Sequence, residues 1–232
     1  MQDSTNHSTY IYISPKKLII CVKSELDEKV YENNLKIEND TGEIDFQKVD
    51  LFLSQNVFKI EKQIQNFITK IYVLLDSKSF FTFDMSVKNN YESILNSKNV
   101  SRLLYDAKDY CRKTLNEKKI IHLIINKYKV DEDYYSYLPE KTSCKSFSLD
   151  ISFFCITNNF FQKLEETFKK YHISINRVVN FNYIEKFLSD EQKDIFLTTK
   201  KIINGHNPNE AMIVDKGTKN EGFFEKFFNF FN

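Results

Sequence analysis

The chain has 232 residues, of which 28% are charged and 41% are hydrophobic, and its formal net charge is +1. This length suits one large domain or two small ones with a sizeable core, and the composition is globular rather than disordered. A nearly neutral chain lacks the basic excess of proteins that wrap nucleic acid, so we expect no nucleic-acid partner.

Targeting signals and cysteines narrow the class of protein further. The opening stretch "MQDSTNHST" is polar and has no apolar core of a signal peptide. No apolar run approaches the roughly 18 residues that a spanning helix needs. We therefore expect a soluble chain. The four cysteines are scattered without a CxxC pair, which predicts reduced, buried thiols at Cys21, Cys111, Cys144 and Cys155.

The first half of the chain alternates strand and helix patterns. Residues 10–22 predict two strands around a Ser14–Pro15 turn, and residues 29–37 predict a third. Residues 54–71 carry apolar side chains at helical spacing, and Ser54 can cap that helix. The next expected elements are, in order, strands at 71–75 and 80–87, a helix at 97–115 and a strand at 119–130.

The second half begins with a tyrosine-rich loop or hairpin end, "DEDYYSYLPEKTS". Tyr134, Tyr135 and Tyr137 in this stretch are candidate contacts for a protein partner, because tyrosine supplies a large and rigid contact area. A solvated loop without a partner is the alternative. The elements expected after it are a strand at 145–157, a helix at 157–172 capped by Thr157 or Asn158, a strand at 173–181, a helix start at 182–188 and a helix at 189–203 capped by Ser189.

The last eleven residues, "GFFEKFFNFFN", contain six phenylalanines. On a helix they fall within an arc of about 160°, and the polar residues occupy the other side. This pattern predicts a short amphipathic helix on a polar tether. Its apolar side needs a surface, which could be lipid, another protein or its own domain. We favour lipid, with the membrane-binding residues Phe223, Phe224, Phe227, Phe228, Phe230 and Phe231.

Catalytic and cofactor motifs are weak. The four glycines are never within four residues of each other, so no phosphate-binding loop is present. Asp40-Thr41-Gly42 fits a plain turn, and the acidic run at 131–133 lacks the glycine of a calcium loop. His122 in "IIHLII" is expected to be a hydrogen-bonded core residue rather than a metal ligand. We expect no catalytic residues, no metal and no cofactor, with ATP binding unlikely on this pattern.

The order of these elements, together with the terminal segment, resembles the bacterial cell-division protein family FtsA. "IIHLIINKYKVD" is similar to the family's strand with a central histidine, and "NVSRLLYDAKDYC" is similar to the first helix of its special subdomain. "GFFEKFFNFF" is similar to its membrane-targeting helix in place and pattern. The departures are "ISPKKL", where a phosphate loop would stand, and the absence of the second half of an actin-like fold.

The resemblance implies an α+β chain with a degenerate, half-size actin-like (ribonuclease-H-like) fold, an FtsA-type inserted subdomain and a C-terminal amphipathic helix. The implied segments are a partial actin-like subdomain over 1–79, the special subdomain over 80–156, a return to the core over 157–203, a linker over 204–221 and the membrane helix over 222–232.

The implied function is a non-enzymatic, membrane-tethered adaptor of cell division, at the cytoplasmic face of the inner membrane and at the division site. Its partners would be other division proteins, inner-membrane lipids and further copies of itself. FtsZ is a candidate partner, although its usual docking subdomain is absent. The alternatives are a pilus-assembly scaffold of the PilM type and an ATP-dependent actin-like filament protein.

Overall fold

The computed structural model of the chain describes residues 7–38 and 41–211. Helices and strands are mixed along the sequence, as expected, and the chain divides into two compact units. The first unit contains Met1–Phe80 and Ile156–Asn204, and the second contains Phe81–Cys155 and Gly205–Asn232. The segment Phe81–Cys155 of the second unit is therefore inserted into the sequence of the first.

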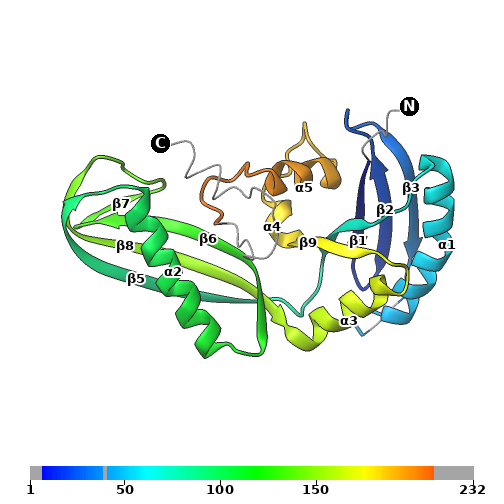
Figure 1. Cartoon of the computed structure of the whole chain (residues 1–232), viewed down its shortest axis with the longest axis horizontal. Helices are drawn as coiled ribbons and strands as arrows, with labels where there is room; N and C mark the ends of the chain where they lie inside the picture. Colours follow the sequence, from blue (N-terminus) through cyan, green and yellow to red (C-terminus); the bar gives the residue numbers. More distant parts are fainter. Residues whose placement is uncertain (1–6, 39–40, 212–232) are drawn as a thin grey trace. The chain divides into compact units, whose positions relative to one another are not determined.

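The first unit is built on a five-stranded sheet with the order β3-β2-β1-β4-β9 (Figure 1). Its strands are β1 (Ser8–Ile13), β2 (Lys17–Lys23), β3 (Lys29–Lys36), β4 (Lys70–Leu75) and β9 (Ser174–Asn180). Strand β2 runs antiparallel to β1 and to β3, whereas β1, β4 and β9 are parallel. This order and these directions agree with the expected ribonuclease-H-like core.

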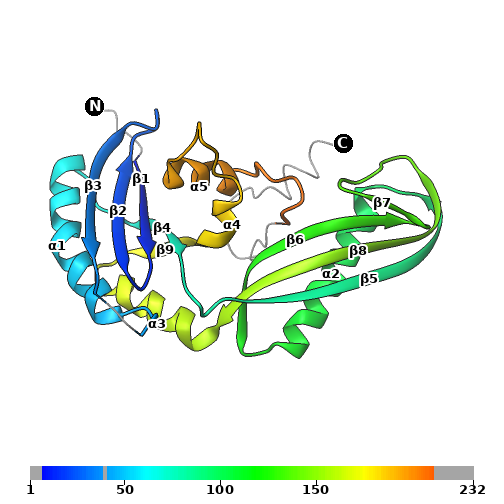
Figure 2. The same ribbon diagram turned by 180° about the vertical axis from the view of Figure 1, so that it is seen from behind.

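Helices cover both faces of this sheet. Successive side chains of a strand point to opposite faces, so each face offers side chains against which a helix can pack. Its helices are α1 (Phe46–Ile64), α3 (Asn158–Lys169), α4 (Phe181–Glu185) and α5 (Ile195–Ile203). Phe196 of α5 packs against Tyr10, Cys21 and Leu74 on one face. Helix α1 contacts β2, β3 and α3, and it covers the other face with α3 (Figures 1 and 2).

Helix α1 begins eight residues earlier than the spacing from Ser54 predicts. The Asp45 carboxylate accepts hydrogen bonds from the N–H groups of Gln47 and Lys48, which satisfies the first turn. Ser54 lies within the helix, and its hydroxyl donates to the Leu51 carbonyl. The helix ends at Gln65, whose left-handed φ of 52° stops it before β4.

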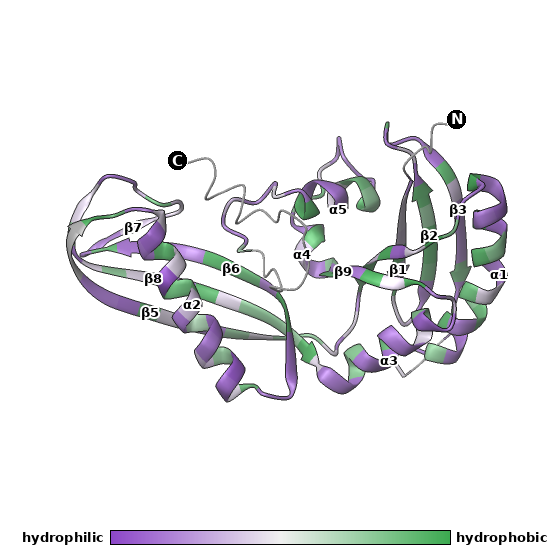
Figure 3. Cartoon of the chain, in the orientation of Figure 1, coloured by the Kyte–Doolittle hydropathy of each residue, from purple (hydrophilic) through white to green (hydrophobic). Residues whose placement is uncertain are grey.

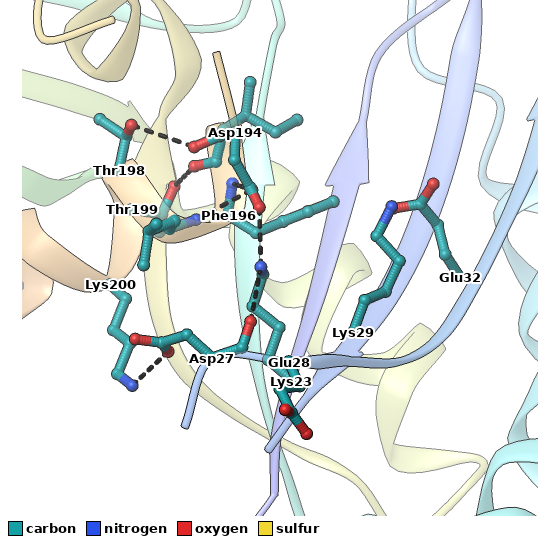
Figure 4. Close-up of polar contacts among 12 residues, drawn as sticks. Lys23, Asp27, Glu28, Lys29, Glu32, Asp194, Phe196, Thr198, Thr199 and Lys200 are labelled. Carbon is teal, nitrogen blue, oxygen red and sulfur yellow. Dashed lines mark hydrogen bonds and ion pairs between the residues drawn. The ribbon is translucent and has the colours of Figure 1, made fainter. Parts of the chain in front are cut away.

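Helix α5 also has a different cap from the predicted Ser189. Asp194 accepts hydrogen bonds from the N–H groups of Phe196 and Leu197 (Figure 4). The same carboxylate accepts from Lys23 Nζ of β2 at 2.7 Å, and Lys23 is 4% exposed. A tertiary ion pair therefore selects Asp194 over Ser189 as the start of the helix.

Burial by itself would raise the pKa of the Asp194 carboxyl. The Lys23 hydrogen bond, together with the helix N–H groups, lowers it below its usual value instead. A second ion pair joins Lys200 of α5 to Asp27, which lies in the turn that follows β2 (Figure 4). These two ion pairs tie α5 to the end of β2, and we assign them a structural role.

The second unit is a four-stranded sheet with the order β5-β8-β6-β7, packed against one helix. Its elements are β5 (Phe81–Ile94), α2 (Ser97–Thr114), β6 (Lys118–Val130), β7 (Asp133–Tyr135) and β8 (Ser143–Thr157). Hydrophobic residues recur along α2 with the helical period (Figure 3). Leu103, Ala107 and Cys111 of α2 join Phe147 and Phe153 of β8 in the core.

All four cysteines are buried and free in the described residues, as predicted. Cys111 and Cys155 lie within hydrogen-bonding contact in the core of the second unit. Burial is the main reason that the pKa of the Cys155 thiol rises to about 12. These thiols therefore stay protonated near neutral pH, which makes them unreactive.

Candidate interaction surface

An apolar groove of about 190 Å³ lies on the second unit. Four segments form it: α2, β6, the stretch that follows β7, and residues 208–211. The apolar side chains that line it belong to Val100, Leu104, Ile125, Leu138, Pro208 and Ala211. An apolar lining with a few polar groups at the rim is typical of a site that binds an apolar side chain of a partner.

The β6–β7 hairpin brings the tyrosine-rich stretch to this groove. Strands β6 and β7 pair in register, with Tyr128 opposite Tyr135 and Val130 opposite Asp133. Asp131 adopts a left-handed φ of 52°, and its carboxylate accepts hydrogen bonds from the N–H groups of Lys145 and Ser146. The acidic run is thus a hairpin turn, and the described residues contain no group of three potential metal ligands.

The three predicted tyrosines point to different places. Tyr137 is 72% exposed and lines the groove. Tyr134 is 61% exposed and lies under the ammonium groups of Lys127 and Lys129, at 5.6 and 5.1 Å from its ring centre. Tyr135 is half-buried against the core. Only Tyr137 is therefore placed to contact a ligand in the groove.

Residues 205–211 do not form the linker that the sequence predicts. The Asn209 carbonyl accepts from the Ile125 N–H, and the Ala211 N–H donates to the Leu123 carbonyl. Asn209 also accepts from the Tyr128 hydroxyl and donates to the Ser136 carbonyl. The segment adds a short bridge to β6 and forms one wall of the groove. A polar sequence between Gly205 and Glu210 gave no signal of this pairing.

His122 is a buried, hydrogen-bonded residue, as predicted. It is 1% exposed, and its Nδ1 lies 2.7 Å from Oε1 of Glu210, which is 5% exposed. A carboxylate can only accept, so the proton lies on His122 Nδ1 when Glu210 is ionised. The buried glutamate is a residue that sequence analysis missed, because nothing in "NPNEA" marks Glu210 as an internal side chain.

A second and larger cavity, of about 470 Å³, lies at the beginnings of β1 and β4 in the first unit. Polar residues predominate in its lining, among them Thr9, Glu25, Lys70 and Lys200. Tyr72 and the 78% exposed Phe67 add aromatic surface. No set of convergent groups gives this cavity a defined chemistry, so the smaller apolar groove is the better candidate site.

The turn between β1 and β2 occupies the position where the resemblance would place a phosphate loop. The Ser14 N–H donates to the Lys17 carbonyl at 2.9 Å, and the Lys17 N–H donates to Ser14 Oγ at 2.9 Å. The backbone N–H groups of Ser14 and Lys17 are thus used within the turn itself, where a phosphate loop would need free N–H groups. Gly42, in the Asp40-Thr41-Gly42 stretch, has a positive φ of 71°, as a turn glycine does.

We therefore expect no ATP binding at millimolar concentrations. The chain has no glycine cluster, and its β1–β2 turn is closed by its own hydrogen bonds. Calorimetric titration of the full chain with ATP and magnesium measures this directly. A micromolar dissociation constant would contradict the prediction and favour the filament alternative.

The six phenylalanines predicted to bind membrane, Phe223, Phe224, Phe227, Phe228, Phe230 and Phe231, lie outside the described residues, as do Asp40 and residues 212–221. Within the described residues, no helix is both long and apolar enough to cross a bilayer.

No protein-family model matches the chain, and no curated protein matches its sequence. One similar solved structure is the cytoplasmic domain of EpsL, an inner-membrane component of the type II secretion system of Vibrio cholerae. It is 10% identical, with a TM-score of 0.38, and the match covers 77% of this chain and 59% of that chain. A PilM–PilN type IV pilus biogenesis complex is 9% identical, with a TM-score of 0.46 and coverages of 78% and 49%.

A third similar structure, from Bacteroides thetaiotaomicron, is a protein with an actin-like ATPase fold and unknown function. It is 12% identical, with a TM-score of 0.32 and coverages of 79% and 56%. This chain thus spans between 49% and 59% of the length of these three structures. Likeness at 9–12% identity assigns the chain to no family and gives it no function.

Proposed function

We propose that this chain is a non-enzymatic adaptor that binds a protein partner through the groove of its second unit and a lipid surface through its phenylalanine-rich terminus. The observation that carries the first half of this proposal is the apolar groove with the exposed Tyr137 at its rim. A large exposed aromatic side chain beside an apolar depression is the usual anatomy of a protein-binding hot spot.

The process that we propose is bacterial cell division, at the cytoplasmic face of the inner membrane and at the division site. The resemblance of the sequence to FtsA, including the terminal segment, supports it. Other division proteins and inner-membrane lipids would be the partners. FtsZ remains a candidate partner.

A pilus-assembly scaffold of the PilM type is the second candidate. The similarity to the solved PilM–PilN complex keeps this alternative open, although at 9% identity it concerns the fold alone. The terminal "GFFEKFFNFFN" favours the division adaptor, because we expect no C-terminal targeting helix on a PilM-type scaffold. The identity of the captured partner distinguishes the two candidates.

We expect Tyr137→Ala to weaken capture of the partner about tenfold, because truncating a hot-spot tyrosine costs more than 1 kcal/mol of binding free energy. Tyr105→Ala is a matched control, since Tyr105 is also 72% exposed but lies on α2 outside the groove. Affinity capture from the native host, with mass spectrometry of the bound proteins, measures both variants.

Division proteins that are lost with Tyr137→Ala and kept with Tyr105→Ala would support the adaptor. Pilus-assembly proteins showing the same pattern would replace it with the second candidate. Equal capture by the two variants would remove the groove from the proposal.

A further inference from the structure

Strand β5 forms one edge of the sheet in the second unit, and it is unusually long for an edge strand. It has 14 residues, pairs with β8 on one side, and has no strand partner on its other side within the described residues. Natural proteins shorten, cover or charge such edges, because exposed backbone N–H and C=O groups recruit further strands. An uncovered edge of this length is a surface for strand addition.

The two faces of β5 differ in character over residues 81–90. Alternate residues, Phe81, Phe83, Met85 and Val87, are half-buried and pack against the core. The residues between them, Thr82, Asp84, Ser86 and Lys88, are exposed. A strand that joins this edge must therefore place apolar side chains on the first face and polar side chains on the second.

We propose that β5 pairs with β5 of a second copy of this chain, antiparallel and around a two-fold axis that passes between the two copies of Ser86. The pairing would join the two four-stranded sheets into one continuous sheet. A two-fold axis perpendicular to the sheet brings like faces together, so the partner strand has the required alternation of apolar and polar side chains.

Charge selects the register. Asp84 and Lys88 are the charged residues of β5 within 81–90, and both are exposed on the polar face. With Ser86 opposite itself, Asp84 of each copy faces Lys88 of the other, so two opposite-charge pairs form. If one β5 strand slides by two residues along the other, neither Asp84 faces a Lys88, and both opposite-charge pairs are lost. On the apolar face the same register sets Met85 opposite Val87 of the partner subunit.

This inference deepens the proposed function, because a dimer carries two membrane-binding termini. When one terminus is bound, the second binds at a high effective concentration, so the dimer holds a lipid surface more tightly than a single copy. Self-association itself needs neither lipid nor a protein partner. It can therefore be tested independently of the adaptor proposal.

The charge pairs provide the first test. Lys88→Asp places two carboxylates opposite each other at both pairs, and it should raise the dimer dissociation constant at least tenfold. The reversed pair, Asp84→Lys with Lys88→Asp, restores opposite charges and should restore the dimer. Sedimentation velocity of the full chain without lipid, over a range of concentrations, measures each variant.

Dimer loss in the single variant with recovery in the double variant would support the proposed register. A chain that is monomeric throughout, a dimer that Lys88→Asp leaves unchanged, or a double variant that fails to recover would each overturn it. A thermal melt checks that every variant is folded.

Cross-linking provides a second test that does not depend on charge. Ser86→Cys places the new thiol opposite its own copy, and mild oxidation should give a covalent dimer. Thr82→Cys is the matched control, because it is exposed on the same face of the same strand. In this register the two copies of residue 82 are eight residues apart along the strands, roughly 26 Å.

The native cysteines give little background, since all four are buried. Covalent dimer with Ser86→Cys and none with Thr82→Cys would support the pairing. Equal yields from the two variants, or no covalent dimer from either, would overturn it.

Discussion

Phe227→Asp is expected to release the full chain from lipid vesicles while leaving its melting temperature unchanged. Phe227 lies well inside the predicted apolar arc of the terminal segment, where a carboxylate would have to enter the lipid interface. Burial of one phenylalanine side chain contributes about 1.5–3 kcal/mol, and a buried charge opposes the binding of the remaining rings. Flotation of neutral vesicles measures the bound fraction.

Asn229→Asp is the control for this prediction. It adds the same negative charge on the polar side of the predicted helix and should leave flotation unchanged. Binding should also depend weakly on salt, because the segment carries one acidic residue, Glu225, beside one basic residue, Lys226. If Phe227→Asp lowers the melting temperature and leaves flotation unchanged, the terminus docks on its own domain and the lipid proposal is wrong.

Glu210→Ala is expected to destabilise the second unit by about 1–3 kcal/mol, because it removes the acceptor that buried His122 contacts at 2.7 Å. For a unit of this size that corresponds to roughly 4–8 °C in melting temperature per kcal/mol. The variant should also loosen the bridge between β6 and residues 209–211, and thereby the wall of the groove. Thermal melting and hydrogen exchange at Ile125 measure the two effects.

Two further variants separate the hydrogen bond from the charge. Glu210→Gln keeps an acceptor oxygen at the same position and should lose less stability than Glu210→Ala. Glu132→Ala removes a glutamate whose side chain is 96% exposed. It should change the free energy of unfolding by less than about 0.5 kcal/mol and therefore leave the melting temperature almost unchanged. Equal melting temperatures for Glu210→Ala and Glu132→Ala would show that the buried contact does not stabilise the fold.

Most strands of this chain could be predicted because their signal is local. The alternation in residues 10–22 around Pro15 predicts β1 and β2, and the structure places them at Ser8–Ile13 and Lys17–Lys23. Thr157 was predicted as a cap of α3, and its hydroxyl does accept from the Phe160 N–H. In both cases the residues that decide the element lie within a few positions of it.

The starts of α1 and α5 could not be chosen from the sequence, because several residues at each start can act as a cap. Ser54 and Ser189 satisfy the same chemical rule as Asp45 and Asp194. Asp194 is selected because it also pairs with Lys23, which is 171 positions away in the chain. The correct start thus depends on a contact that no local pattern encodes.

By itself, the sequence determined the order and type of the elements, the absence of glycine-rich phosphate loops and the amphipathic pattern of the terminus. Only the tertiary structure decided that residues 209–211 pair with β6, that Glu210 is buried against His122, and that Tyr137 rather than Tyr134 borders a groove. Periodicity shows which side of an element is apolar, but it does not identify the surface that this side contacts. His122 and Glu210 are 88 positions apart, and only the folded chain brings such a pair together.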